Sequence, residues 1–168
     1  MYKIFIFVFA GMVFAQDDGL KAYRNGDYEH ARHYYESILE EKDEDAAAQF
    51  GLGTTAFQQK NFQGALDAFK WALETEDKEL RSKAYYNMAN TLVNQKMNEE
   101  ALVFYRKALE LNPGDKDTKH NYEMLRYQQQ QEQQQQGKSE ENQQQRQGED
   151  QQQENEGEKK EEQQEQQQ

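Results

Sequence analysis

The sequence predicts an all-α protein built as a solenoid of stacked helix pairs, followed by a low-complexity tail. Apolar residues recur at positions i, i+4, i+7 and i+8 in several segments, which is the spacing of one face of an α-helix. Three alanines in equivalent segments, Ala31, Ala65 and Ala101, stand 34 and 36 residues apart. A fixed period of this length is typical of helical repeats, in which each pair buries its apolar stripe against the next pair.

The first 15 residues, MYKIFIFVFAGMVFA, are predicted to be a signal peptide. Lys3 forms a minimal positive region, an apolar stretch follows, and Val13 and Ala15 suit the small-residue positions of a cleavage site. The stretch is too short to cross a membrane, which takes about 20 apolar residues. We therefore expect an exported protein that is periplasmic after cleavage, without direct membrane insertion. An uncleaved N-terminal anchor and a buried helix are the alternatives.

Composition and charge exclude several classes of protein. The chain contains no Cys, so it has no disulfide, redox dithiol, thiolate metal site or thioether lipid anchor. Its formal net charge is −12, and no cluster of Lys and Arg could follow a phosphate backbone. Anionic lipid surfaces would repel such a chain. These observations argue against nucleic acid as a partner and favour a protein.

Three helices are predicted in the segments EHARHYYESILEEKDED, GALDAFKWALETED and ALVFYRKALELNPGD, which begin at residues 29, 64 and 101. Two further helices, in AAAQFGLGTTAFQQKNF and KAYYNMANTLVNQKMN, precede the second and third of these. The connecting turns are short and polar, with Gly26 where a left-handed backbone is useful, so the helices of a pair should be antiparallel. We expect Gly53 and Ala89 to let the alanines of the partner helix approach closely. The residues expected to fill the gaps between successive pairs are Tyr35, Phe69 and Tyr105.

These segments resemble the tetratricopeptide repeat (TPR) family, whose 34-residue motif has a large–small pair in its first helix, two alanines and an aromatic residue in its second, and a closing proline. Residues 82–115 match the motif well, residues 46–79 carry Asp77 where the proline is expected, and residues 16–45 match in degenerate form. The matching residues are Gly19, Gly26, Tyr28, Ala31 and Tyr35, then Leu52, Gly53, Ala65, Phe69 and Ala72, then Tyr85, Met88, Ala89, Leu92, Ala101, Tyr105, Ala108 and Pro113. The resemblance implies a TPR domain over residues 16–127.

The C-terminal part of that domain is predicted to be a capping helix over residues 116–127. Asp115 or Asp117 can cap its N-terminus, and Tyr122 and Leu125 should lie on the last repeat. Residues 128–168 form an acidic tail with 20 Gln among 41 residues, too polar to bury a core. We interpret the tail as a spacer; a tether for a basic partner, or a helix that forms a coiled coil on binding, is the alternative.

The order of these parts is similar to that of the BatC-type TPR proteins of the Bacteroides aerotolerance operon. The resemblance rests on the leader, about three repeats, the stretches KELRSKAYYNMANTL and ALELNPGDKDTKHNYEML, and the Gln/Glu-rich tail. It implies an envelope protein that helps to assemble a membrane-associated complex in stress or oxygen tolerance. The partner it implies is another envelope protein, such as a membrane-anchored von Willebrand factor A-domain protein, and the role it implies is not catalytic.

A partner is expected in the concave groove of the solenoid, which the TPR resemblance assigns to the first helix of each pair. Asn87, Asn90 and Asn94 stand at i, i+3 and i+7 and put three amides on one helix face. An amide can both donate to and accept from the backbone of an extended peptide; the alternative is a polar solvent face. The other predicted groove residues are Tyr23, Arg24, Phe50, Thr54, Phe57, Gln58, Lys83, Tyr86, His120, Asn121 and Met124.

Other kinds of site have little support in the sequence. Gln16 and Leu20 stand where TPR domains that bind a C-terminal carboxylate need Lys and Asn. His30 and His33 lack a third metal ligand, no Ser or Cys has a plausible His partner, and no glycine-rich phosphate loop occurs. We therefore expect no cofactor and no catalysis, and assign Trp71 to packing. The alternative function is a general holder of exported client proteins, and the oligomeric state is left open.

Overall fold

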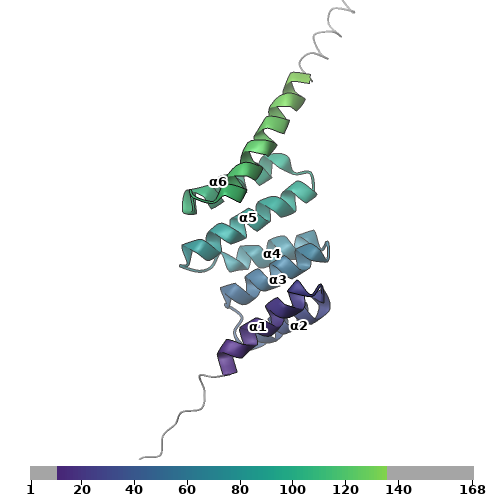
Figure 1. Cartoon of the computed structure of the whole chain (residues 1–168), viewed down its shortest axis with the longest axis vertical. Helices are drawn as coiled ribbons and strands as arrows, with labels where there is room; N and C mark the ends of the chain where they lie inside the picture. The colour runs from purple at the N-terminus through teal and green to yellow at the C-terminus, as the bar shows by residue number, and fades with distance from the viewer. Residues whose placement is uncertain (1–10, 136–168) are drawn as a thin grey trace, which may run out of the picture. The chain divides into compact units, whose positions relative to one another are not determined.

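Helices and short connections make up residues 11–135, the part of the chain that the computed structural model describes, and no strand occurs in that range. Figure 1 shows the labelled helices stacked in consecutive pairs. They are α1 (Gly11–Arg24), α2 (Tyr28–Glu41), α3 (Ala46–Gln58), α4 (Phe62–Ala72), α5 (Lys78–Asn94) and α6 (Asn98–Leu111). A seventh helix begins at residue 116 and is described as far as residue 135. The predicted all-α solenoid is confirmed.

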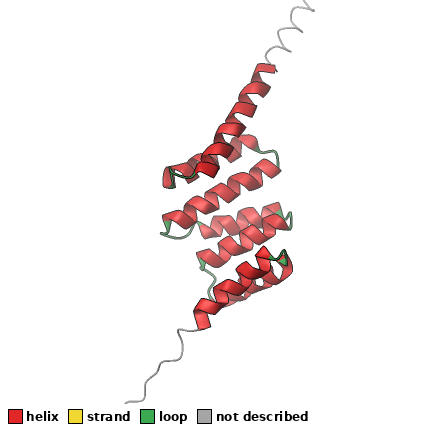
Figure 2. Ribbon diagram, viewed as in Figure 1, coloured by secondary structure: helices red, strands yellow, loops and turns green. Residues whose placement is uncertain are grey.

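Each labelled helix packs against the next one along the chain, and α3 also contacts both α1 and α5 (Figure 2). The first helices of the three pairs therefore form one layer. The solenoid and the seventh helix as far as Leu125 form one compact unit, and residues 126–135 belong to a second unit. None of the helices within residues 11–135 is long and apolar enough to span a bilayer.

Two predicted segments lie partly outside the described residues. They are the leader, through residues 1–10, and the tail, through residues 136–168. Within the described range, α1 begins at Gly11, which is inside the predicted leader. Cleavage after Ala15 would therefore leave residues 16–24 of this helix.

Aspartates begin the first helix of each later pair and the seventh helix. Asp45, Asp77 and Asp115 precede α3, α5 and the seventh helix, and each carboxylate accepts two backbone N–H groups of the first turn at 2.8–3.2 Å. These bonds satisfy donors that have no partner inside the helix. Asp77 occupies the position where the repeat motif has proline. It serves there as the N-cap of α5, which begins at Lys78 and is 17 residues long.

The caps at Asp45 and Asp115 make the stability of the fold depend on pH. Burial by itself raises the pKa of each carboxyl, but the backbone N–H groups they cap, with Lys42 beside Asp45 and the Thr118 hydroxyl beside Asp115, lower both pKa values below the usual one. Such groups stabilise the fold above their unfolded pKa of about 3.9, and this contribution is lost as the pH falls through the folded pKa.

Replacing both residues by Asn is expected to flatten the loss of stability between about pH 4 and pH 2, because Asn still caps a helix but does not titrate there. Urea unfolding of the double variant and the parent, followed by circular dichroism at several pH values, measures this. An unchanged pH profile would show that the two caps do not contribute to acid unfolding.

The turn inside each pair uses one residue with a left-handed backbone. Gly26, Lys60 and Lys96 have φ angles of 78°, 60° and 62°, and each is followed by the N-cap of the second helix. The prediction for Gly26 is confirmed. The two lysines adopt the same backbone although side chains disfavour it, so the three turns share one conformation without sharing a glycine.

Met97 is the weak N-cap among the three second helices. Asp27 and Asn61 accept N–H groups of α2 and α4, whereas Met97 makes no side-chain cap bond at α6. Replacing Met97 by Asn is expected to stabilise the domain by about 1 kcal/mol, or roughly 4 °C in Tm. Met97→Ala is the matched control, since it removes the same exposed side chain without adding a cap. Equal Tm values for the two variants would contradict the expectation.

Glycines on the first helices accept aromatic rings from the second helices. A Cβ at Gly53 would lie 2.6 Å from the Phe69 ring, and Gly19 and Gly51 stand in the same way against Tyr34 and Tyr35. The prediction that Phe69 fills the space between helices is confirmed, and Gly53 is the residue that leaves room for it. The missing side chain makes room for a ring, which buries more apolar surface than an alanine would.

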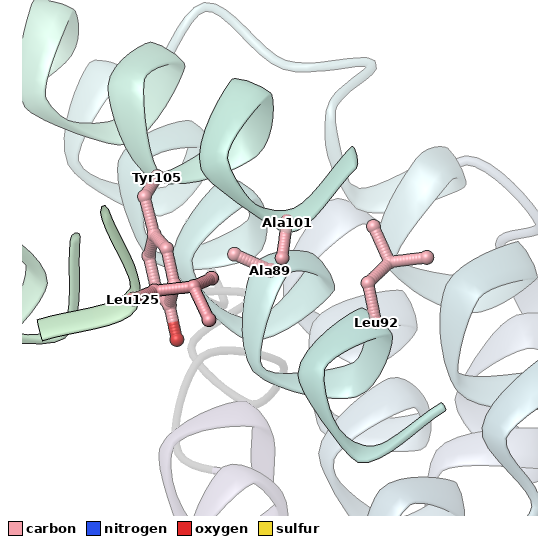
Figure 3. Packing of buried hydrophobic residues seen from close by; sticks show 5 residues of the cluster. All are labelled: Ala89, Leu92, Ala101, Tyr105 and Leu125. Atoms are coloured by element: carbon pink, nitrogen blue, oxygen red, sulfur yellow. The ribbon is translucent and has the colours of Figure 1, made fainter. Parts of the chain in front are cut away.

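The core consists of small residues and aromatic rings. One cluster contains Ala89, Leu92, Ala101, Tyr105 and Leu125 (Figure 3), and it shows the predicted packing of Leu125 on the last repeat. A second cluster contains Ala56, Ala65, Phe69 and Met88. Alanines bring the helix backbones close, and the rings fill the remaining space.

Trp71 does not pack into this core, contrary to the prediction. Its side chain is 61% exposed, although Ala68, Phe69 and Ala72 of the same helix are buried. Two residues advance an α-helix by about 200°, so the residue two positions after buried Phe69 points to the opposite side.

Candidate functional site

A cavity of about 130 Å³ lies where the first helices of the three pairs meet. Its wall combines residues of α1, α3, α4 and α5, namely Tyr23, Thr54, Phe57, Gln58, Phe69, Asn87 and Asn90. Six of these seven are residues that the sequence predicted to face the groove. The structure thus brings together side chains that are up to 67 positions apart in the chain.

Phe69 is the wall residue that sequence reasoning missed, because its spacing assigned it to packing alone. Its ring is fully buried and lies 5.8 Å from the ring of Phe50. Gly53 was the available signal: the absent side chain on α3 lets the ring of a second-helix residue reach the layer of first helices. Phe50 itself is half-buried beside Phe69 and is not part of the cavity wall.

Polar side chains of α1 and α3 are held by hydrogen bonds. Gln58 Nε2 donates to the Tyr23 hydroxyl at 3.0 Å, which links α1 to α3. Thr54 Oγ1 donates to the backbone oxygen of Gly51 at 2.9 Å. The Tyr23 hydroxyl oxygen is therefore an acceptor in this contact, and its own proton is available to another acceptor.

The three predicted groove asparagines are not equivalent. Asn90 Oδ1 accepts from the Tyr105 hydroxyl at 2.5 Å and from Asn121 Nδ2 at 3.4 Å. Asn94 is exposed, lies outside the cavity wall, and donates from Nδ2 to the backbone oxygen of Asn90 at 2.9 Å. Among the residues that the structure describes, Asn87 alone of the three has an amide without a hydrogen-bond partner.

Tyr105 anchors this network from α6. Its side chain is 2% exposed, and burial raises its pKa to about 12. The hydroxyl therefore stays protonated at any ordinary pH and remains a donor to Asn90. The ring of Tyr86 lies 6.0 Å from that of Tyr105, and the Tyr86 hydroxyl accepts from Asn121 Nδ2 at 3.3 Å.

The remaining predicted groove residues lie outside the cavity wall. Lys83 is exposed and its Nζ pairs with Glu79 at 2.6 Å. Arg24, His120 and Met124 are exposed. No charged side chain lines the cavity, although the chain as a whole carries a net charge of −12.

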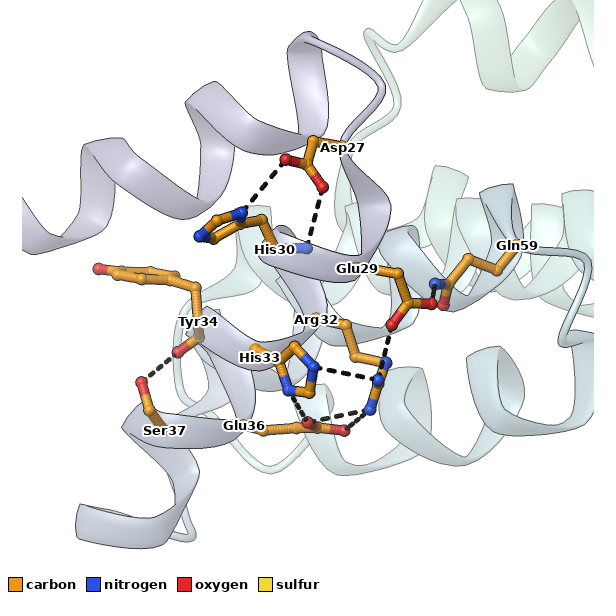
Figure 4. A network of polar contacts seen from close by, with 9 residues as sticks. All are labelled: Asp27, Glu29, His30, Arg32, His33, Tyr34, Glu36, Ser37 and Gln59. Carbon is orange, nitrogen blue, oxygen red and sulfur yellow. Dashed lines mark hydrogen bonds and ion pairs between the residues drawn. The ribbon is translucent and has the colours of Figure 1, made fainter.

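The two histidines of α2 belong to a surface network of ion pairs (Figure 4). Arg32 bridges Glu29 and Glu36 at 2.7 and 2.8 Å, and its hydrogen bond with Glu29 lowers the pKa of that carboxyl. His33 Nδ1 lies 3.3 Å from Glu36, and His30 Nδ1 lies 3.2 Å from Asp27. Within the described part of the chain, no three potential ligands are arranged to hold a metal ion.

These features define a helical-repeat protein with an uncharged cavity on the layer of its first helices. The family descriptions that match are both of the tetratricopeptide repeat, over residues 17–79 and 82–115. The chain belongs to the tetratricopeptide-repeat family. Repeats of this family generally mediate protein–protein interactions. No curated protein matches the chain significantly in sequence.

Solved structures share the fold at low sequence identity. The TPR domain of Arabidopsis OM64 is 22% identical, with a TM-score of 0.63 over 68% of this chain and 93% of that one. The first TPR of Spaghetti (RPAP3), bound to the HSP90 peptide SRMEEVD, is 19% identical with a TM-score of 0.62, over 68% and 90% of the two chains. An O-GlcNAc transferase of Thermobaculum terrenum is 20% identical with a TM-score of 0.63, over 71% of this chain and 23% of the transferase.

Proposed function

We propose that this protein is a non-catalytic scaffold of the bacterial cell envelope that holds an extended segment of a partner protein in its concave groove. The observation that carries the proposal is the cavity in the layer of first helices, where aromatic rings and amides converge from several helices. Aromatic walls bury apolar side chains at low entropic cost, and amides pair with a peptide backbone. The similar domain bound to an HSP90 peptide is consistent with a peptide ligand.

The envelope location and the kind of partner rest on the sequence. The predicted leader of residues 1–15 supports export, and the resemblance to BatC-type proteins supports a role in a membrane-associated stress or aerotolerance complex. A membrane-anchored von Willebrand factor A-domain protein is the partner we propose. Gln16 and Leu20, in place of Lys and Asn, argue against recognition of a C-terminal carboxylate.

A second candidate function is the holding of unfolded exported clients. Exposed apolar side chains support it, since Trp71 and Met124 are 61% and 57% exposed. Scattered exposed apolar groups bind without sequence preference, whereas a cavity selects particular side chains. The two functions therefore differ in where on the surface a partner is captured.

Site-specific photocrosslinking separates these candidates. A benzoyl-phenylalanine photocrosslinking residue is introduced at Asn87, on the cavity wall, or at Trp71, exposed on α4 and outside the cavity. The variants are irradiated in the native envelope, and captured proteins are identified by mass spectrometry. The Asn87 position is expected to capture one dominant membrane-anchored protein that the Trp71 position does not.

Each other outcome has a definite meaning. A scatter of unrelated exported proteins at both positions would replace the scaffold with the client-holding function. Capture of one partner from Trp71 alone would place the binding surface on the second helices. Absence of any partner at Asn87 would overturn the groove as the binding site.

A further inference from the structure

The turn that joins α1 to α2 differs from the two equivalent turns in the reactivity of its residues. Asn25 and Gly26 stand where each of the other two turns has Gln followed by Lys, at residues 59–60 and 95–96. In all three turns, the N–H of the left-handed residue donates to the backbone oxygen three residues earlier at 3.0 Å. The repeat therefore places two different pairs of residues on one backbone conformation.

An asparagine that is followed by glycine can convert itself to aspartate or isoaspartate. The Gly26 nitrogen attacks Cγ of Asn25, which closes a five-membered succinimide ring. The Cγ–Nδ2 bond breaks, and ammonia leaves with the proton of the Gly26 N–H. Water then opens the ring at either carbonyl, and nothing is oxidised or reduced. Glycine leaves the attacking nitrogen unhindered because it has no Cβ, and asparagines are among the thermolabile residues of proteins.

The structure leaves both reacting groups accessible. Asn25 is exposed, and its side-chain amide has no hydrogen-bond partner among the described residues. A Cβ built on Gly26 would meet no atom within 4 Å. The Gly26 N–H donates to the Tyr23 oxygen while the turn is closed, so the attack takes place when the turn opens. Since α1 belongs to the first pair of the solenoid and terminal elements open most easily, this turn is favourably placed.

The residues of the other two turns slow the same reaction. A glutamine side chain is one carbon longer, so it would have to close a six-membered ring. The lysine that follows it places a side chain next to the attacking nitrogen. Gln59 Nε2 also donates to Glu29 Oε1 at 2.7 Å, which holds that amide away from its own backbone. Of the three turns, the first alone combines asparagine with glycine.

Conversion of Asn25 would disturb the turn in two ways. Isoaspartate adds one carbon to the main chain, so the geometry that supports two backbone bonds is lost. These bonds run from the Gly26 N–H to the Tyr23 oxygen at 3.0 Å and from the Asp27 N–H to the Ala22 oxygen at 2.9 Å. The new carboxylate also lies at the C-terminal end of α1, where the helix dipole disfavours a negative charge.

Tyr23 connects this turn to the cavity. It stands two residues before Asn25 and lines the cavity, and its hydroxyl accepts from Gln58 Nε2 at 3.0 Å. Its ring lies edge-on to Tyr28 of α2, with 5.7 Å between the ring centroids. A shift of the last turn of α1 against α2 therefore moves a side chain of the cavity wall.

We propose that Asn25 is a self-modification site of this protein, and that its conversion to isoaspartate loosens the first helix pair and withdraws Tyr23 from the cavity wall. Chains that have aged at this site then bind their partner less well. The effect on binding rests on the proposed function, whereas the chemical step and the loosening of the turn do not.

Ageing of the full wild-type chain tests the chemical step. The folded protein is incubated at mildly alkaline pH, and peptide mapping by mass spectrometry detects the replacement of the amide NH2 by OH. Isoaspartyl methyltransferase, used as a reagent, labels the isoaspartate. We expect conversion at Asn25 in the folded chain. Conversion that occurs in urea but not in the folded chain would overturn the proposal, because the closed turn would then prevent the reaction.

Gly26→Lys is the matched control for the reaction. It keeps Asn25 and copies the residue that the other two turns carry at φ angles of 60° and 62°. Conversion at Asn25 is expected to be at least about tenfold slower in this variant, because the attacking nitrogen then carries a hindered neighbour. An equal rate in the parent and in a folded Gly26→Lys chain would contradict the role assigned to glycine.

Two measurements follow the structural effect in the aged wild-type chain. Hydrogen exchange of the Gly26 and Asp27 amides is expected to lose protection, and the NMR signals of the Gln58 side-chain amide are expected to shift. Asn25→Gln, aged in the same way, should keep both properties, since it carries the residue of the other two turns. Unchanged Gln58 signals in a chain that contains isoaspartate would overturn the link to the cavity.

Photocrosslinking at Asn87 separates this inference from the proposed function. A fresh chain tests the scaffold alone, because no ageing is involved. Capture of the partner is expected to fall in the aged chain and to persist in aged Asn25→Gln. Equal capture by fresh and aged chains would overturn the effect on binding and leave the scaffold in place. Failure of the fresh chain to capture a partner would remove the scaffold, while the conversion at Asn25 is still decided by mass spectrometry.

Discussion

Replacing Phe69 by Ala is expected to lower the free energy of unfolding of this domain by about 3–5 kcal/mol. The ring is fully buried in the cluster with Ala56, Ala65 and Met88. The short side chains of Ala56 and Ala65 cannot extend into the space that the ring would leave, and the larger side chains around the cluster, such as Phe50, could fill only part of it. The loss therefore includes both the transfer energy of the ring and the cost of the cavity that remains.

Urea unfolding followed by circular dichroism measures this effect, with Trp71→Ala as the matched control. Trp71 is on the same helix and is larger, but it is 61% exposed, so its removal is expected to change stability by about 0.5 kcal/mol or less. Comparable losses for the two variants would contradict the burial that distinguishes them. Phe69→Ala should also enlarge the cavity, because the ring is part of its wall.

Gly53→Ala is expected to destabilise the domain by about 1 kcal/mol and by no more than about 2 kcal/mol, although alanine is the better helix former. Alanine in a helix interior is favoured over glycine by about 1 kcal/mol. A Cβ at residue 53 would lie 2.6 Å from the Phe69 ring, which is fully buried and cannot swing into solvent. Overpacking of this kind typically costs about 1–3 kcal/mol, and we expect it to exceed the gain in helix propensity.

Two comparisons test the cause of that loss. Gly51→Ala meets the ring of Tyr35, which is only half-buried and can shift, so its cost should be smaller. Combining Gly53→Ala with Phe69→Leu should cost less than the sum of the two single substitutions, by about 0.5–3 kcal/mol, because the smaller side chain relieves the contact. Strict additivity of the two would show that the ring is not the obstacle.

The seventh helix has two roles: it covers the last repeat, and it holds a residue of the cavity wall in place. Leu125 closes the core cluster beside Tyr105, and Asn121 of the same helix bonds to Asn90 and to Tyr86. The helix that ends the solenoid thus fixes the orientation of an amide that lines the cavity. Packing and site geometry are coupled at this point, as is common where a buried polar network joins two elements.

Much of the fold is determined by the sequence itself. The spacing of Ala31, Ala65 and Ala101 predicts the repeat, and Leu125 is correctly predicted to pack on the last repeat. Gly26 and the cap at Asp115 are also predicted correctly. These features are local: periodicity, caps and turns depend on residues within a few positions of one another, so their physics can be read along the chain.

The tertiary structure alone decided which of the predicted groove residues are available to a ligand. Helical spacing places Asn87, Asn90 and Asn94 on one face, but the partners of Asn90 lie 15 and 31 residues away on other helices. The exposure of Trp71 and the entry of the Phe69 ring into the cavity wall likewise depend on how neighbouring helices pack. A one-dimensional pattern specifies the face of a helix, whereas the hydrogen-bond partner and the free space at each position are set by the helices that pack against it.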